Sequence, residues 1–160
     1  MKLRRLTPQD EATLTELLTN DRIKQTYMLP DFPQREEAIS LARKMMQLSR
    51  EETRFVRGMD EGGTLVGFLN DVEIADGVIE LGYVVHPDHW NKGLATAALT
   101  LAIAELFSRG FREVVCGAFE ENPSSLRVME KAGMAPLEKV DEIDYRGKVR
   151  RCLYRSIKAE

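Results

Sequence analysis

Trp90-Asn91-Lys92-Gly93-Leu94-Ala95-Thr96 joins two dissimilar segments of a 160-residue chain. Residues 78–86 before it are rich in apolar side chains, as in a strand, and the residues after it have helical spacing to about residue 109. The first turn of a helix carries unpaired N–H donors and the positive end of the helix dipole. Gly93 and Ala95 have almost no side chain, so a phosphate or pyrophosphate could approach these donors closely. The stretch therefore predicts a protein that handles a phosphorylated ligand.

Two common phosphate loops fit this stretch poorly. A P-loop needs a second glycine followed by Lys and Ser or Thr, and neither is present. A dinucleotide-binding fold needs three glycines after the first strand and an acidic residue about 20 residues later. Here the single glycine lies in mid-chain, and the helix that follows lacks that acid. A nucleotide-binding fold is therefore disfavoured.

A second motif, Asn122-Pro-Ser-Ser125-Leu-Arg-Val-Met-Glu-Lys131-Ala-Gly133, follows the next apolar segment. Asn122 is a good helix N-cap, and Ser125 lies in the first turn of the same helix. An asparagine cap and a glycine stop also occur in many helices without a functional role. The order of the two motifs, separated by one helix and one strand, favours a functional interpretation.

Together the two motifs resemble those of the GCN5-related N-acetyltransferases, the GNAT superfamily. In that family a Gln/Arg-x-x-Gly-x-Gly/Ala turn after the fourth strand binds the pyrophosphate of acetyl-coenzyme A. This chain has Trp90 at the first position of that turn. Residues 80–96 nevertheless look most like the branch that contains ribosomal-protein and polyamine N-acetyltransferases, in which an aromatic residue is familiar at this position.

The resemblance implies acetyl-CoA as co-substrate and names the residues that would bind it. The backbone around Val84 or Val85 would bind the acetyl carbonyl oxygen at a β-bulge that parts the fourth and fifth strands. Asn122 and Ser125 would flank the pantetheine arm. The remaining cofactor-binding residues would lie in the turn: Asn91, Lys92, Gly93, Leu94, Ala95 and Thr96.

Glu80 is the candidate general base. It lies among apolar residues, so its carboxylate should be partly desolvated and its pKa raised. Amide formation needs a neutral amine, whereas alkylammonium groups are mostly protonated at neutral pH. Several relatives use a glutamate on this strand as the base. A surface-facing glutamate, or one that only binds the acceptor's charge, stays open as an alternative.

Protonation of the leaving thiolate is less clear from the sequence. Many family members use a tyrosine on the helix after the fifth strand, but this chain has Met129 there, which cannot donate a proton. Ser125 could donate instead, or the thiolate, with a pKa near 8.5 as a free thiol, could leave unaided. A non-catalytic acyl-CoA-binding sensor on the same fold is therefore the alternative to an enzyme.

The order of elements predicts an α/β (α+β) fold in one domain, residues 1–160. We expect a central mixed, mostly antiparallel sheet of about seven strands flanked by helices, with strands four and five parallel and splayed apart. Expected strands are 2–6, 53–59, 64–72, 78–86, 113–119, 137–144 and 148–157. Expected helices are 7–18, a second after about 33, a buried central helix over 94–109, and a short one from 123 to before Gly133.

Composition narrows the function further. A net charge of −3 predicts no nucleic-acid partner, which usually needs a basic face. Cys116 and Cys152 are too few for a disulfide framework, and Cys116 should be a small core residue. His86 and His89 have no third partner, so we expect no metal. With no signal or membrane segment, we expect a cytoplasmic protein that binds no membrane.

The acceptor is an amine that the sequence does not identify: the N-terminal amine of a protein or peptide, or a small-molecule amine. Family resemblance also implies that the chain could form a homodimer. The basic residues near the C-terminus are typical of a solvated hairpin, with the 3′-phosphate of coenzyme A as an alternative partner. These residues are Arg146, Lys148, Arg150 and Arg151.

Overall fold

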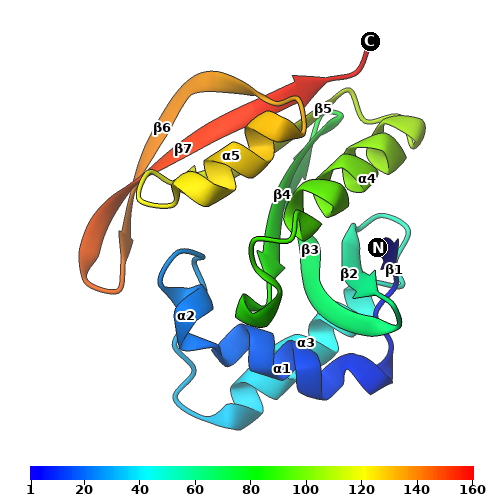
Figure 1. The fold of residues 1–160 in the computed structure, drawn as a ribbon, viewed down its shortest axis with the longest axis vertical. Coiled ribbons are helices and arrows are strands. Elements are labelled where there is room, and N and C mark those ends of the chain that lie inside the picture. Colours follow the sequence, from blue (N-terminus) through cyan, green and yellow to red (C-terminus); the bar gives the residue numbers. More distant parts are fainter.

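Seven strands lie in one sheet in a computed structural model that describes residues 1–160 (Figure 1). Their spatial order is β1-β2-β3-β4-β5-β7-β6, and only the β4–β5 pair is parallel. The strands are β1 (Lys2–Arg4), β2 (Val56–Glu61), β3 (Thr64–Ala75), β4 (Val78–Val85), β5 (Glu113–Phe119), β6 (Ala135–Tyr145) and β7 (Lys148–Lys158). The predicted mixed, mostly antiparallel sheet is confirmed.

Five α-helices cover the two faces of the sheet. They are α1 (Glu11–Thr19), α2 (Asp21–Lys24), α3 (Arg35–Leu48), α4 (Leu94–Ser108) and α5 (Pro123–Lys131). The sequence analysis missed α2, although Asn20 is a clear N-cap whose side chain accepts hydrogen bonds from the N–H groups of Arg22 and Ile23. None of these helices combines the length and the apolar character needed to cross a membrane.

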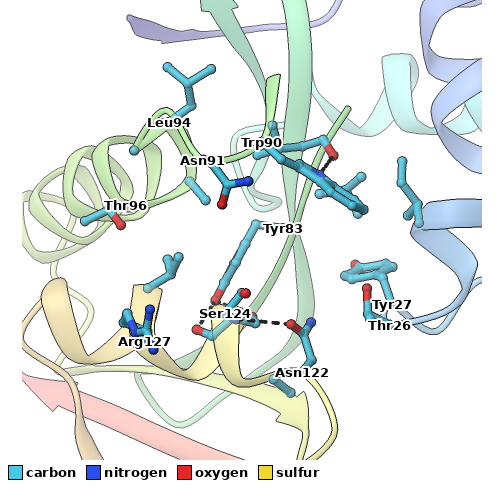
Figure 2. Close-up of a pocket in the computed structure, with 18 of the residues that line it drawn as sticks. Thr26, Tyr27, Tyr83, Trp90, Asn91, Leu94, Thr96, Asn122, Ser124 and Arg127 are labelled. Carbon is cyan, nitrogen blue, oxygen red and sulfur yellow. Dashed lines mark hydrogen bonds between the residues drawn. The ribbon is translucent and has the colours of Figure 1, made fainter. Parts of the chain in front are cut away.

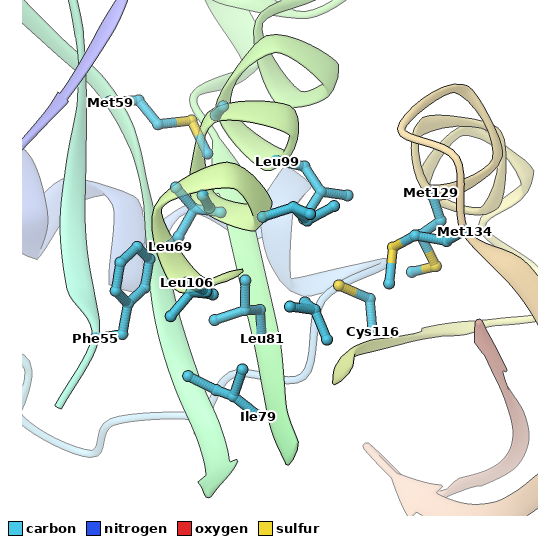
Figure 3. Close-up of a cluster of buried hydrophobic side chains, with 14 of the residues drawn as sticks. Phe55, Met59, Leu69, Ile79, Leu81, Leu99, Leu106, Cys116, Met129 and Met134 are labelled. Carbon is cyan, nitrogen blue, oxygen red and sulfur yellow. The ribbon is translucent and has the colours of Figure 1, made fainter. Parts of the chain in front are cut away.

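Two apolar clusters form on opposite faces of the sheet because side chains alternate along each strand. On one face, Ile79 and Leu81 of β4 pack with Leu99 and Leu106 of α4 and with Cys116 of β5 (Figure 3). On the other face, residues of β2, β3 and β4 pack against α1, α2 and α3; among them are Val56, Phe68, Val84, Leu14, Ile23 and Met45. Cys116 is fully buried, as expected for a small core residue.

The parallel strands β4 and β5 separate part-way along their length. They pair from Val78–Glu113 to Leu81–Cys116 and no further. β4 nevertheless continues to Val85, paired with β3, and β5 continues to Phe119, paired with β7. Each strand is thus held by its outer neighbour, and a gap opens inside the sheet. The predicted splaying is confirmed.

The predicted β-bulge at Val84 or Val85 is wrong. The ladder between β3 and β4 is regular from Gly82 to Val85, and its register shifts between Asp71 and Glu73 on β3 instead. The extra residue of this bulge is therefore Val72. The gap arises because β4 and β5 diverge, without an extra residue in β4.

Helix α4 is buried on one face only, which corrects the expectation of a buried central helix. Leu99 is 0% exposed, whereas Leu101, two residues later on the same helix, is 44% exposed. Residues two apart do not share a helix face. The apolar composition of α4 therefore exceeds what its packing requires.

This pair supplies a test of the packing. We expect Leu99→Ala to lower the free energy of unfolding by about 3 kcal/mol, because it removes a buried side chain and leaves a cavity. Leu101→Ala should change it by less than about 0.5 kcal/mol. Urea denaturation of both variants measures the difference, and equal losses would contradict the assigned orientation of α4.

Candidate active site

A cavity of about 520 Å³ lies where β4 and β5 separate, bounded by α2, α4 and α5 (Figure 2). Nine of the ten predicted cofactor-binding residues line it, and Lys92 does not. The nine are Val84, Val85, Asn91, Gly93, Leu94, Ala95, Thr96, Asn122 and Ser125. The structure therefore brings together both sequence motifs around one space.

The N-terminus of α4 opens on this cavity without a cap. The first intrahelical bond is donated by the N–H of Ala97 to the Gly93 carbonyl at 3.1 Å, and no side chain caps the helix. The N–H groups of Leu94, Ala95 and Thr96 are thus available to an anion. Gly93 has a φ of 74° with open space at its Cβ position, so a side chain there would be strained and would enter the cavity.

The N-terminus of α5 differs, because Asn122 caps it. Its Oδ1 accepts a hydrogen bond from the N–H of Ser125 at 3.2 Å. This cap orients the first turn of α5 toward α4 across the cavity (Figure 2). Further along α5, the exposed cationic residues Arg127 and Lys131 also line the cavity. The sequence analysis did not single out these two residues, although their spacing of four places them on one helix face.

Tyr83 is the main site residue that the sequence analysis missed. It projects from β4 into the cavity toward α5 (Figure 2). Its hydroxyl lies 2.7 Å from Ser125 Oγ and donates to the Ser125 carbonyl at 3.0 Å. Burial raises the pKa of Tyr83 well above its usual value, so the phenol stays protonated. The alternation of side chains along β4 could have identified Tyr83 as inward-facing, because it shares a face with the core residue Leu81.

The backbone of Val85 points into the gap. The N–H of His86 donates to the Val66 carbonyl at 2.8 Å, which fixes the alternation of the β3–β4 ladder. The N–H groups of Tyr83 and Val85 therefore face away from β3, toward the space that β5 leaves. The Val84 N–H faces β3, so of the two predicted oxyanion donors only the Val85 N–H faces the gap.

Trp90 links the turn to two other elements. Its indole N–H donates to the Val85 carbonyl at 2.7 Å (Figure 2). The guanidinium of Arg22, on α2, lies 4.9 Å from the centre of the indole ring. Trp90, which departs from the general family pattern, thus connects the turn with the end of β4 and with α2.

Glu80 lies on the opposite face of β4 from Tyr83 and does not line the cavity wall. Its carboxylate is half-buried, and this burial raises its pKa. Glu73 and Asp141 raise the pKa further, while Lys139 lowers it, and no hydrogen bond to the carboxylate contributes. The carboxylate is therefore desolvated and free of partners, as a general base requires, but its role stays a prediction.

Tyr27 closes the cavity near Glu80. Its hydroxyl donates to Asn70 Oδ1 at 3.1 Å. A Cβ at Gly82, on the same face of β4 as Glu80, would lie only 2.4 Å from the Tyr27 hydroxyl oxygen. Glycine at position 82 therefore allows Tyr27 to approach β4, because a side chain there would clash with the Tyr27 hydroxyl. No sequence signal placed these residues together, because they are far apart in the chain.

Met129 is 0% exposed and packs in the apolar core, so it does not face the cavity.

The ring nitrogens of His86 both form hydrogen bonds: Nε2 with Glu16 Oε1 at 2.8 Å, and Nδ1 with the N–H of Asp88 at 3.1 Å. No group of three or more potential metal-ligating side chains is found. His86 is thus held by structural hydrogen bonds.

The C-terminal basic residues do not line the cavity. Arg146, Lys148 and Arg151 form ion pairs with Asp31, Glu121 and Glu120 respectively. The guanidinium of Arg150 lies 5.6 Å from the ring centres of both Phe119 and Tyr145. The suggested contact with a 3′-phosphate is therefore not supported for this group.

Comparison with known proteins agrees with this geometry. The family model described as an acetyltransferase (GNAT) domain matches residues 1–135. The chain belongs to the GNAT superfamily. This membership confirms the resemblance stated above and the prediction of an acetyl-CoA-dependent N-acetyltransferase.

Several GNAT proteins are similar over most of their length. An uncharacterized N-acetyltransferase, YoaA of Bacillus subtilis (strain 168), is 27% identical over 136 residues, which are 82% of this chain and 77% of YoaA. Spermidine N-acetyltransferase from Vibrio cholerae, solved with CoA and spermine, has a TM-score of 0.83 at 20% identity, covering 98% of this chain and 94% of its own.

Ribosomal-protein-S5-alanine acetyltransferase from Vibrio fischeri has a TM-score of 0.80 at 15% identity, covering 98% of this chain and 91% of its own. At such identities the similarity concerns the fold. Because the similar structures include enzymes for both a polyamine and a protein, the fold alone does not identify the acceptor of this GNAT protein.

The turn before α4 supplies a binding test. We expect Gly93→Trp to weaken coenzyme A binding by about tenfold or more, because the new side chain occupies the space beside the free N–H groups. Gly62→Trp is the matched control: Gly62 also has a positive φ (61°) and open space, in the β2–β3 turn. Titration calorimetry compares the two, and equal affinities would exclude the turn as the phosphate site.

Proposed function

We propose that this protein transfers an acetyl group from acetyl-CoA to a primary amine by direct attack in a ternary complex. One observation carries the proposal: the uncapped N-terminus of α4 and the gap between β4 and β5 open on the same cavity. The first can hold a pyrophosphate, and the second can admit an extended arm with a thioester at its end.

The cofactor would bind along the length of the cavity. The N–H groups of residues 93–96 would hold the pyrophosphate, with Arg127 and Lys131 adding positive charge on the opposite wall. The pantetheine arm would pass between β4 and β5, beside Asn122. The carbonyl oxygen of the acetyl group would accept a hydrogen bond from the Val85 N–H, which would also stabilise the negative charge of the tetrahedral intermediate.

Glu80 would accept the proton that the acceptor ammonium must lose, directly or through a water molecule. The amine nitrogen then attacks the thioester carbon, and the carbon–sulfur bond breaks. Glu80 lies on the other face of β4 from Tyr83, so the acceptor would approach from the side of Tyr27 and Gly82. The raised pKa of Glu80 makes it a stronger base than an exposed glutamate.

Ser125 would donate a proton to the leaving thiolate and regain one from the attacking nitrogen, directly or through a water molecule, so that a neutral amide, a thiol and the serine hydroxyl remain. The Tyr83 hydroxyl, 2.7 Å from Ser125 Oγ, would orient the serine and remain protonated because its pKa is raised. Ser125 and Tyr83 would thus supply the proton-donating hydroxyl that is missing at Met129, where many family members have a tyrosine. Met129 is the best support for a non-catalytic sensor. Acetylation of any amine in a panel of spermidine and short peptides with free N-termini would exclude the sensor.

A positively charged acceptor fits the surroundings of Glu80. Three carboxylates, those of Glu80, Glu73 and Asp141, lie here with one cation, Lys139, whose ammonium is 3.8 Å from Asp141. These carboxylates would attract an ammonium group. Spermidine, which is acetylated by a structurally similar enzyme, is therefore a suitable first amine, together with peptide N-termini.

The base can be tested through the pH dependence of the rate. A base must be deprotonated, so kcat/KM should rise with pH through the Glu80 pKa, which lies above the usual value. Glu80→Gln should lower kcat/KM by about 100-fold and remove this rise. Glu73→Gln, which removes a carboxylate charge from β3, should keep this rise but move it to slightly lower pH, because Glu73 helps to raise the Glu80 pKa. An unchanged profile in Glu80→Gln would rule out its role as base.

The proposed acid can be tested with neighbouring serines. Ser125→Ala should lower kcat by about tenfold, whereas Ser124→Ala, in the same helical turn, should not. Because Tyr83 would act through Ser125, adding Tyr83→Phe to Ser125→Ala should cost less than it does in the parent. Parent-like kcat in Ser125→Ala would show that the thiolate leaves without this proton donor.

A further inference from the structure

The tip of the β6–β7 hairpin contacts the segment that follows α2, about 120 residues earlier in the chain (Figure 1). Tyr145, the last residue of β6, is buried there. Its hydroxyl lies 2.8 Å from the carbonyl oxygen of Lys24, 3.1 Å from that of Tyr27 and 3.2 Å from that of Leu29. It also accepts a hydrogen bond from the Leu29 N–H at 3.3 Å. One side-chain hydroxyl thus joins the backbone of three residues.

This segment has little means of holding its own shape. Helix α2 has only four residues, Asp21–Lys24, and so short a helix is not stable alone. Its last carbonyl, that of Lys24, has the shortest distance to the Tyr145 hydroxyl. Helix-terminal carbonyls need partners outside the helix, and Tyr145 supplies one from a distant element. The location of residues 24–29 therefore depends on the hairpin as well as on the burial of Leu29 in the apolar cluster.

Further contacts join the same two elements. Arg150 of β7 donates to the Gln25 carbonyl at 3.3 Å. Arg146, in the hairpin turn, lies 3.5 Å from Asp31, which also pairs with Lys24 at 3.2 Å. Arg146 and Asp31 are exposed, so the ion pair between them contributes little. Lys24 is buried, but its pair with Asp31 does not involve the hairpin. The buried hydroxyl of Tyr145 is thus the central contact.

The held segment forms the acceptor end of the cavity. Thr26 and Tyr27 line the cavity, and Figure 2 shows both projecting from the α2 side. Tyr27 also reaches Asn70 and approaches Gly82, next to Glu80 on β4. A displacement of residues 24–29 would therefore move the wall that the amine contacts. The turn around Gly93 should move less, because the α2 residue that contacts its Trp90 is Arg22, which precedes the held segment.

We propose that Tyr145 is a positioning residue for the acceptor: its hydroxyl holds residues 24–29 so that Tyr27 shapes the amine subsite. This rests on the proposed function, since it assumes that the amine enters beside Tyr27. Tyr145 does not contact the substrates. Its effect is transmitted through the backbone of the held segment.

Tyr145→Phe tests this proposal with a small change. Phenylalanine keeps the stacking on Phe119, whose ring centre lies 5.6 Å away, and removes only the hydroxyl. Ser49→Ala is the matched control. The Ser49 hydroxyl is also buried and joins two backbone groups, the Leu6 N–H at 2.9 Å and the Val56 carbonyl at 2.7 Å, but it lies outside the cavity lining.

Three measurements on the full chain separate the outcomes. In Tyr145→Phe, amide hydrogen exchange of residues 24–31 should rise about fivefold, which Ser49→Ala should not reproduce. The KM for the most reactive amine of the panel above should rise about fivefold, with kcat within about twofold. The Kd for coenzyme A, from titration calorimetry, should also stay within about twofold.

Unchanged exchange in residues 24–31 would overturn the proposal whatever the kinetics. Raised exchange with parent-like acceptor KM would overturn it as well, because the segment would then not shape the subsite. An equal rise of the KM in Ser49→Ala would show a general loss of stability instead. Failure of the proposed function is distinct: the parent would bind coenzyme A without acetylating any amine, and the exchange measurement would still decide whether Tyr145 holds the segment.

Discussion

The site depends on the separation of β4 from β5 beyond Leu81 and Cys116. Backbone N–H and C=O groups inside a sheet are nearly always paired, and an open edge between two internal strands is therefore unusual. Here β3 holds β4 to Val85 and β7 holds β5 to Phe119, so each strand continues although its edge toward the other is unpaired. The open edge leaves backbone donors free for a ligand.

The chain itself places the anion site next to this opening. β4 ends at Val85, a short turn follows, and α4 begins at Leu94, so the free N–H groups of the helix must lie near the end of the strand. Trp90 reinforces this arrangement through its hydrogen bond to the Val85 carbonyl. The proposed thioester and pyrophosphate subsites thus belong to one continuous backbone segment, which explains why a short stretch of sequence points to both.

The predicted residues that line the cavity are those whose geometry is set locally. Gly93, Asn122 and Ser125 could be identified because a turn, a cap and a helical first turn each depend on a few neighbouring residues. The parallel β4–β5 pair follows from the helix between these strands. The bulge was misplaced because a resemblance to a family does not fix the register of one ladder. Tyr83 was missed because its importance depends on what faces it across the gap.

The residues on the proposed acceptor side of the site, unlike those on the cofactor side, are not marked by a local sequence pattern. Tyr27 reaches Asn70 of β3 and Gly82 of β4, and Tyr145 of the β6–β7 hairpin contacts the Tyr27 carbonyl, so this side depends on the packing of separate elements. By itself the sequence determined the strand–turn–helix unit that can hold a pyrophosphate, because its geometry is set by short-range backbone and capping preferences. Only the tertiary structure decided which side chains surround the amine, because those contacts join residues too far apart in the chain for any local pattern to record.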